Sequence, residues 1–447
     1  MPLSGRRRRA AWVLILALLL PMEETGAADL IDLYTKARQF DPVFRAAEFE
    51  LQISEQVIRE SQSGVLPSLT AEVERSRTKQ DVKESDSVLF QIGEREFDNT
   101  NFAITLIQPI YRSSAWARLP QARAEARQAE ANYAAAEQDL MFRLAQAHFN
   151  FMAARDNLDF ATAERTAIWR QLLETEERLG SGLATITDLH DARARFALAE
   201  AAESGAADVL EEARAAIMEI TGDAPADLNP LSESFPYVPP DKADVEAWVE
   251  AAMFQNNTIR ARREAATVAE QEIRRQRGVY LPSLDFVASF NDRDTEGTVF
   301  GGGNRTATAD FALRLAIPIY DGGRGSALAA AAALRHRITL EELEREKRRV
   351  ERETRTSFNG VMGGIARVEA LIKSVFSNER ALAAREEAFR SGIGTGVAVL
   401  DARRDLYSAK RDLSQARYLY ILNSLRLKQS AGTLSVADLR QVNVHLH

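Results

Sequence analysis

The sequence predicts a mainly α-helical protein with a smaller β part, built from two copies of one half-protein. The first observation is a repeat: Leu66-Pro67-Ser68-Leu69 returns 215 positions later as Leu281-Pro282-Ser283-Leu284. The second is a pair of very long stretches with helical patterning, and the third is two pairs of segments in which apolar and polar residues alternate. A solenoid unit runs roughly 20–50 residues, so this much longer period indicates a tandem duplication.

The composition excludes several classes of protein. The 447-residue chain has no cysteine, which rules out a disulfide framework and thiolate chemistry. Its formal net charge of −8 argues against nucleic-acid binding, which needs clustered basic surface.

Residues 1–28 are typical of a secretory signal peptide. Four arginines, Arg6 to Arg9, precede an apolar run from Ala10 to Leu20 and the small residues Gly26-Ala27-Ala28. An uncleaved membrane anchor is the alternative, but the run is shorter than the ~20 residues of a spanning helix. We therefore expect an exported protein without a transmembrane helix.

The first repeat is expected to span residues 29–222. Its expected elements, in chain order, are a helix broken at Asp41-Pro42, strands at about 66–76 and 100–110, a long helix at 113–179 and a return helix at 185–220. Asp41 suits a helix N-cap and Pro42 suits the first helical position. The long helix carries apolar residues at alternating spacings of four and three, which is the pattern of a coiled-coil seam.

A linker and a second repeat follow. The linker, 223–243, is rich in proline and therefore cannot form a helix or a central strand. The second repeat, 244–432, is expected to contain strands at about 281–291 and 308–319, a long helix at 326–390 and a return helix at 397–430, before a C-terminal tail at 433–447. We expect the two histidines at the end of this tail, His445 and His447, to be solvated. Asp292 falls where the next apolar residue is due, so we expect the third strand to end there.

The strands have one apolar and one polar face, which has two explanations. Such a sheet either covers a soluble core or faces lipid on one side and water on the other. Each strand has about the ten residues that cross a bilayer, and each long helix makes a rod of roughly 90–100 Å. Four strands cannot close a barrel of useful width, and open edges are not tolerated in lipid. If these strands enter a membrane, several chains must therefore contribute their strands to one closed barrel.

The chain resembles the TolC family of outer-membrane channel-tunnels, which serve efflux and type I secretion. The resemblance rests on the doubled Leu-Pro-Ser-Leu, on the strand ends Gln108-Pro109-Ile110-Tyr111 and Ile317-Pro318-Ile319-Tyr320, and on the turn segments at 182–188 and 399–402. It implies a homotrimer with a shared twelve-stranded β-barrel in the outer membrane and a long α-helical barrel that extends into the periplasm.

The resemblance also implies partners. These are outer-membrane lipid, a periplasmic adaptor protein and an inner-membrane transporter of the ABC or RND type. The alternative that the sequence leaves open is a soluble periplasmic coiled-coil scaffold or adaptor, whose strands form an ordinary sheet.

In that family, polar links between helical hairpins close the periplasmic end, and acidic rings narrow the entrance. Carried over residue by residue, the resemblance implies that the gate and entrance positions are Gln171, Asp188, Glu386, Phe389 and Asp401. Phe389 stands where a tyrosine is usual and has no hydroxyl to bond Asp188. Ala398 and Gly394 also depart from the pattern. A plain capping role beside glycine-rich turns is the alternative for Asp188 and Asp401.

We expect no enzymatic activity, no cofactor and no metal site. The histidines have no ligand constellation around them, and no nucleophile elbow is present. The segment Asp321-Gly322-Gly323 lacks the Lys and Ser/Thr of a phosphate-binding loop.

Overall fold

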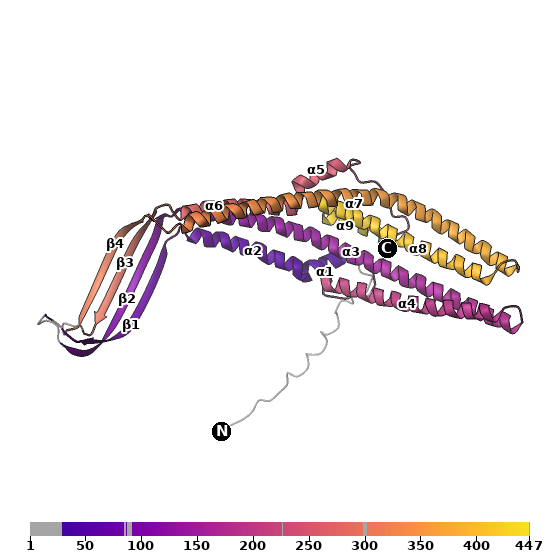
Figure 1. Cartoon of the computed structure of the whole chain (residues 1–447), viewed down its shortest axis with the longest axis horizontal. Coiled ribbons are helices and arrows are strands. Elements are labelled where there is room, and N and C mark those ends of the chain that lie inside the picture. The colour runs from indigo at the N-terminus through magenta and orange to yellow at the C-terminus, as the bar shows by residue number, and fades with distance from the viewer. Residues whose placement is uncertain (1–28, 85, 87–91, 226, 298–301, 447) are drawn as a thin grey trace, which may run out of the picture.

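The computed structural model describes residues 29–84, 86, 92–225, 227–297 and 302–446 of the 447-residue chain. The expected signal peptide, residues 1–28, lies outside the described residues. The protein is elongated, with a four-stranded sheet at one end and two helical hairpin tips at the other (Figure 1). Among the helices that the structure describes, none combines the length and the hydropathy needed to cross a bilayer.

The first repeat forms six elements. They are α1 (Leu30–Phe40), α2 (Pro42–Ser63), β1 (Ser68–Val82), β2 (Gly93–Tyr111), α3 (Ser113–Gly180) and α4 (Ile186–Thr221). The break between α1 and α2 is the expected one: the Phe44 amide donates to the Asp41 side chain at 2.6 Å, and Pro42 begins the helix. The 68 residues of α3 make a rod about 100 Å long.

The second repeat has the same order of elements. They are α5 (Val245–Gln255), α6 (Asn257–Gly278), β3 (Ser283–Thr295), β4 (Asn304–Ala316), α7 (Arg324–Arg390) and α8 (Gly396–Ser430). Asn256 takes the place of Asp41, because its side chain accepts a hydrogen bond from the Ile259 amide at 3.0 Å.

The sheet has the order β1-β2-β3-β4 and is antiparallel throughout. Its register places apolar side chains opposite one another, as in the row Leu69, Leu106, Ala288 and Phe311. The other face carries rows such as Thr70, Thr105, Ser289 and Asp310. Within the described residues, β1 and β4 each pair on one side only, so the sheet has two open edges.

The strands are longer than the sequence predicts, and the prediction that β3 stops at Asp292 is wrong. β3 continues to Thr295 because Arg305 on β4 pairs with Asp292 at 2.6 Å. β1 and β2 are likewise extended by Arg77, whose Nε lies 2.7 Å from Asp98. Cross-strand ion pairs thus support polar residues within a sheet. β4 ends at Ala316, three residues earlier than expected and ahead of Pro318.

The long helices form a layer centred on α3. Near the sheet, α3 lies between α2 and α6, and α7 packs on the far side of α6. Beyond the middle of the rod, α3 pairs with α4 and α8, while α7 pairs with α8. The outer edges of the layer are therefore α2 and α4 on one side and α7 on the other.

The main hydrophobic core lies around the middle of the rod. Its largest fully buried side chains on α3 are Phe149, Phe151, Leu140, Leu144 and Met152. The C-terminal tail contains a helix that the sequence does not predict, α9 (Val436–Asn443), which packs into this core through Leu439. With only eight residues, α9 is too short for the spacing of its apolar residues to be recognised in the sequence. His445, which we expect to be solvated, is half-buried, and its ring lies edge-on to Phe235 with the centroids 5.1 Å apart. His447 lies outside the described residues.

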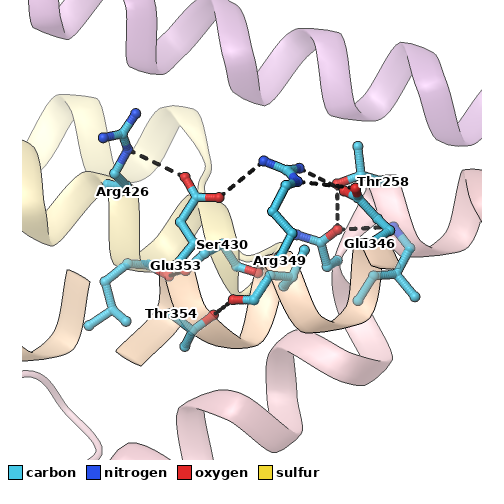
Figure 2. A network of polar contacts seen from close by, with 11 residues as sticks. Thr258, Glu346, Arg349, Glu353, Thr354, Arg426 and Ser430 are labelled. Carbon is cyan, nitrogen blue, oxygen red and sulfur yellow. Dashed lines mark hydrogen bonds and ion pairs between the residues drawn. The ribbon is translucent and has the colours of Figure 1, made fainter. Parts of the chain in front are cut away.

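A polar network ties α6, α7 and α8 together beside the core (Figure 2). Arg349 pairs with Glu346 at 2.6 Å and with Glu353 at 3.2 Å, and Arg426 on α8 approaches Glu353 at 3.6 Å. Glu346 also lies beside Thr258 on α6, and the Arg349 guanidinium holds the pKa of Glu346 below its usual value. We call these five residues the mid-rod network.

Candidate functional site

The two hairpin tips end in matching glycine turns. Gly182 follows α3 with φ of 76°, and Gly392 follows α7 with φ of 78°. Both values lie in the left-handed region, which glycine adopts without a steric cost. Backbone bonds close each turn: the Leu183 amide donates to the Arg178 carbonyl, and the Ile393 amide donates to the Ala388 carbonyl. The duplicated turns bring α4 and α8 back along α3 and α7.

Asp188 is used within its own helix. One of its carboxylate oxygens accepts from the Thr185 amide at 2.8 Å and from the Thr185 hydroxyl, and the Asp188 amide donates back to that hydroxyl at 3.2 Å. These bonds favour the ionised carboxylate and lower the pKa of Asp188. The geometry is a capping box, so the structure gives Asp188 the helix-capping role that the sequence leaves open as an alternative.

Gln171 and Phe389 line a cavity of about 220 Å³ between the two hairpins. Gln171 is buried, although it sits near the end of α3. The Arg178 guanidinium lies over the Phe389 ring, 4.8 Å from its centroid. A cation–π contact from α3 to α7 therefore joins the two hairpins at Phe389, the position at which the resemblance implies a tyrosine.

Asp401 on α8 pairs with Arg195 on α4 at 2.9 Å. Both side chains are partly exposed, at 43% and 31% respectively. This ion pair also joins the first hairpin to the second. An exposed pair of this kind stabilises the contact between the hairpins by roughly 0.2–1 kcal/mol, so it can break at a small cost in free energy.

Glu386 pairs with Arg403 at 2.7 Å, inside the α7–α8 hairpin. A second nitrogen of Arg403 donates to the Ala167 carbonyl of α3 at 3.2 Å. Arg403 thus connects Glu386 to the first hairpin through the backbone of α3.

The junction of α3 and α8 continues towards the core through more polar contacts. Arg411 pairs with Glu164 at 3.3 Å, and the Tyr418 hydroxyl donates to Asp156 at 2.7 Å. Burial, with the Asp156 charge beside it, raises the pKa of Tyr418. Polar links between the hairpins are therefore dense from the tips up to the core.

Sequence reasoning missed the three arginines that carry these links. Arg178, Arg195 and Arg403 each meet a residue that it identified: Phe389, Asp401 and Glu386 respectively. Part of the signal is visible in the sequence, where Asp191-Ala192-Arg193 and Asp401-Ala402-Arg403 repeat the same motif in the two return helices. The pairing across hairpins depends on tertiary structure, which the motif does not contain.

Comparison with known proteins supplies sequence relatives over nearly the whole chain. The outer membrane protein TolC of Vibrio cholerae is 34% identical, over 94% of this chain and 94% of the relative. The proteases secretion protein PrtF of Dickeya chrysanthemi is 30% identical, over 97% of this chain and 95% of the relative.

Solved structures agree on the fold. The outer membrane channel CmeC of Campylobacter jejuni superposes with a TM-score of 0.79 at 14% identity, covering 100% of this chain and 98% of that one. The sequence model described as outer membrane efflux protein matches residues 33–223 and 248–433. Matches of this extent to the family model and to the TolC relative show that the chain belongs to the outer membrane efflux protein family.

Proposed function

We propose that the chain is the exit duct of a tripartite efflux or type I secretion system in the outer membrane, where membership of this family places it. The main support for this proposal is the uncovered apolar face of the four-stranded sheet. Its apolar face is uncovered, with Leu69 71% exposed and Phe311 76% exposed, and no helix of the described chain packs over it. A surface like this is favourable against lipid and unfavourable against water.

The periplasmic scaffold is the disfavoured alternative. A soluble sheet of this kind would bury its apolar face against a second layer. The family is described as one of efflux proteins, and the proposed duct catalyses no reaction.

The assembly that we propose is a homotrimer with one twelve-stranded β-barrel. Each chain supplies four strands, and the open edges at β1 and β4 must be paired in lipid. Below the barrel, the free edges at α2 and α7 would meet in the same way to continue a helical barrel. The duct is passive, so transport depends on a periplasmic adaptor protein and on an inner-membrane ABC- or RND-type transporter. PrtF is named for protease secretion and the family for efflux, and these two names support the proposal that the duct works with transporter machinery.

Exposed apolar side chains support a seam between chains at the helical edges. On α2 they are Phe49 and Ile53, and on α7 they are Leu334 and Ile338, with exposures between 48% and 60%. Contacts across the layer place the two pairs at similar heights along the rod: His336–Ala266 from α7 to α6, Arg127–Glu264 from α6 to α3, and Phe44–Tyr133 from α2 to α3.

The variant Ile338→Asp is expected to dissociate the trimer. It would bury three carboxylates in the seams, each at a cost of several kcal/mol. The measurement is the mass of the detergent-solubilised protein by light scattering, with Ile338→Val as the conservative control. A trimer of unchanged stability in Ile338→Asp would remove Ile338 from the interface.

The gate that we propose lies at the hairpin tips. Phe389 with Arg178 and Glu386 with Arg403 hold the two hairpins in the closed arrangement, and the buried Gln171 lies between the hairpins. Asp188 shapes the first tip, and Asp401 contributes both the link to Arg195 and an acidic ring at the constriction. An acidic ring favours cations in a narrow pore.

The experiment that tests the function is conductance in a planar bilayer. The purified trimer is expected to insert and give uniform, cation-preferring current steps. A folded protein that never conducts would favour the scaffold.

A further inference from the structure

The duplication gives each strand residue of the first repeat one equivalent in the second. The repeated Leu-Pro-Ser-Leu motif relates β1 to β3 by an offset of 215 positions. A second pair of motifs relates β2 to β4. Phe102-Ala103 and Pro109-Ile110-Tyr111 return as Phe311-Ala312 and Pro318-Ile319-Tyr320, each 209 positions later. The two strand pairs can therefore be compared residue by residue.

The pairing of strands inside the chain follows these two offsets. Leu69 on β1 lies opposite Leu106 on β2, and their equivalents Leu284 and Leu315 lie opposite each other on β3 and β4. Every pair of the β3–β4 ladder matches a pair of the β1–β2 ladder in this way. The duplication has therefore preserved the register of the strands as well as their order.

The pairing between the two repeats gives a register for the open edges of the sheet. β2 of the first repeat pairs with β3 of the second, and Thr105 lies opposite Ser289. The equivalent strands at the open edges are β4 of one chain and β1 of another. An open edge offers its unpaired backbone groups to such a strand. The residues equivalent to Thr105 and Ser289 are Arg314 and Glu74, and this register places them opposite each other.

Arg314 and Glu74 carry opposite charges on the polar face of the sheet, and both side chains are exposed in the single chain. Within its own chain, Arg314 lies opposite Asp285. Both oxygens of that carboxylate already accept hydrogen bonds from Arg112, at 3.1 and 2.9 Å. Glu74 lies opposite the neutral Asn101. The two open edges therefore present a cation and an anion at the positions that the duplication brings together.

We propose that β4 of one chain pairs with β1 of the next in this register, and that Arg314 forms an ion pair with Glu74 of the neighbouring chain. Opposite charges at directly opposed positions of two strands attract each other, whereas like charges repel. We call this β4–β1 contact the strand seam. The inference rests on the proposed trimeric duct and adds to it the register of the strand seam and the ion pair that holds it.

Glu72 makes the register and the charge two separate questions. It lies two residues before Glu74 on the same face of β1, so a slip of two residues would give Arg314 a different acidic partner. Disulfide formation distinguishes the two registers. Directly opposed Cβ atoms lie about 4.5–5.5 Å apart and diagonal ones about 7–8 Å, whereas a disulfide needs about 3.5–4.5 Å.

The chain has no cysteine of its own, so engineered cysteines are the only thiols. Ala312→Cys with Ser76→Cys is the seam pair, because the proposed register places these positions opposite each other. Asp310→Cys with Ser76→Cys is the slipped pair, which the alternative register would bring together. The full-length, detergent-solubilised protein is oxidised and run on a denaturing gel without reductant. The seam pair is expected to give at least roughly fivefold more covalent trimer than the slipped pair.

The matched control lies inside the chain. Ala103→Cys with Asn291→Cys joins the equivalent positions of β2 and β3, which are directly opposed in the structure. Both thiols of this protein are expected to be lost on oxidation, without any link between chains. This control shows that the sheet is folded and that a disulfide can form at a pair of this kind.

Charge reversal tests the ion pair in the same gel. In the seam-pair protein, Arg314→Glu is expected to lower the yield of covalent trimer roughly fivefold, because like charges then oppose each other. Adding Glu74→Arg is expected to restore the yield. Glu72→Arg is the matched control, and its diagonal position is expected to restore less than half as much.

A higher yield of covalent trimer from the slipped pair than from the seam pair would overturn the register and leave the proposed duct in place. Equal rescue by Glu72→Arg and Glu74→Arg would overturn the ion pair. If neither pair gives covalent trimer while the internal control closes, the register is also wrong. The mass of the unoxidised protein by light scattering then decides whether the trimer itself, and with it the proposed duct, has failed.

Discussion

Replacing Arg195 by alanine is expected to open the periplasmic end of the duct. The variant removes the ion pair with Asp401 that joins α4 to α8. Each such pair contributes up to about 1 kcal/mol, so three copies in a trimer sum to at most about 3 kcal/mol. A change of that size shifts the balance between closed and open states by up to roughly a hundredfold. Single-channel recording in a planar bilayer measures the open fraction and the conductance.

Asp401→Asn is the matched variant, because it breaks the same ion pair from the other side. Both variants are expected to raise the open fraction, and the double variant is expected to add little to either, as for any shared contact. Their ion selectivities should move in opposite directions. Arg195→Ala would leave an unpaired carboxylate at the proposed constriction and raise the cation preference, whereas Asp401→Asn would lower it. Unchanged selectivity in Asp401→Asn would remove this residue from the acidic ring.

The free energy of unfolding is expected to decrease as the pH is lowered from 6.5 to about 4, because of His148 on α3. This side chain is fully buried in the main core, and neither ring nitrogen has a partner. Burial, aided by the nearby charge of Arg155, lowers the pKa of His148 to about 4. The unfolded chain takes up a proton near pH 6.5 and the folded chain does not, so stability is lost as the pH falls through this window. The full effect is on the order of 3 kcal/mol per chain.

His148→Leu tests this expectation, since it removes the titrating group and two unpaired nitrogens. Thermal unfolding is compared at pH 8 and pH 5, where the variant should lose less stability than the parent by about 2 kcal/mol per chain. His190→Leu, at an exposed position on α4, is the control and should keep the pH dependence of the parent. Identical pH dependence in all three proteins would contradict this expectation. It would show that the pKa of His148 is the same in the folded and the unfolded chain.

Local rules of sequence predict much of this fold. Asp41-Pro42 marks the break between α1 and α2, and the alternation of apolar residues marks every strand of the sheet. The resemblance to the channel-tunnel family is confirmed by the relatives and by the family model. These features depend on residues that are neighbours in sequence, which is why the sequence alone reveals them.

What the sequence does not predict depends on contacts between distant segments. The strands extend past Asp292 because Arg305 lies across from it, and this partner is known only once the register is known. The tip residues Asp401 and Phe389 can be found by resemblance, but their partners Arg195 and Arg178 lie on the other hairpin. The sequence does not predict α9 because this helix gains its stability from packing rather than from its own eight residues.

The most direct test of the proposed duct is the conductance of the unmodified, detergent-solubilised protein in a planar lipid bilayer. Uniform current steps that prefer cations are expected, because twelve strands contributed by three chains would enclose a water-filled pore with an acidic constriction. A protein shown to be folded and trimeric that gives no current steps, even when Arg195→Ala has removed a tip link, would contradict the duct. That result would support a periplasmic scaffold instead.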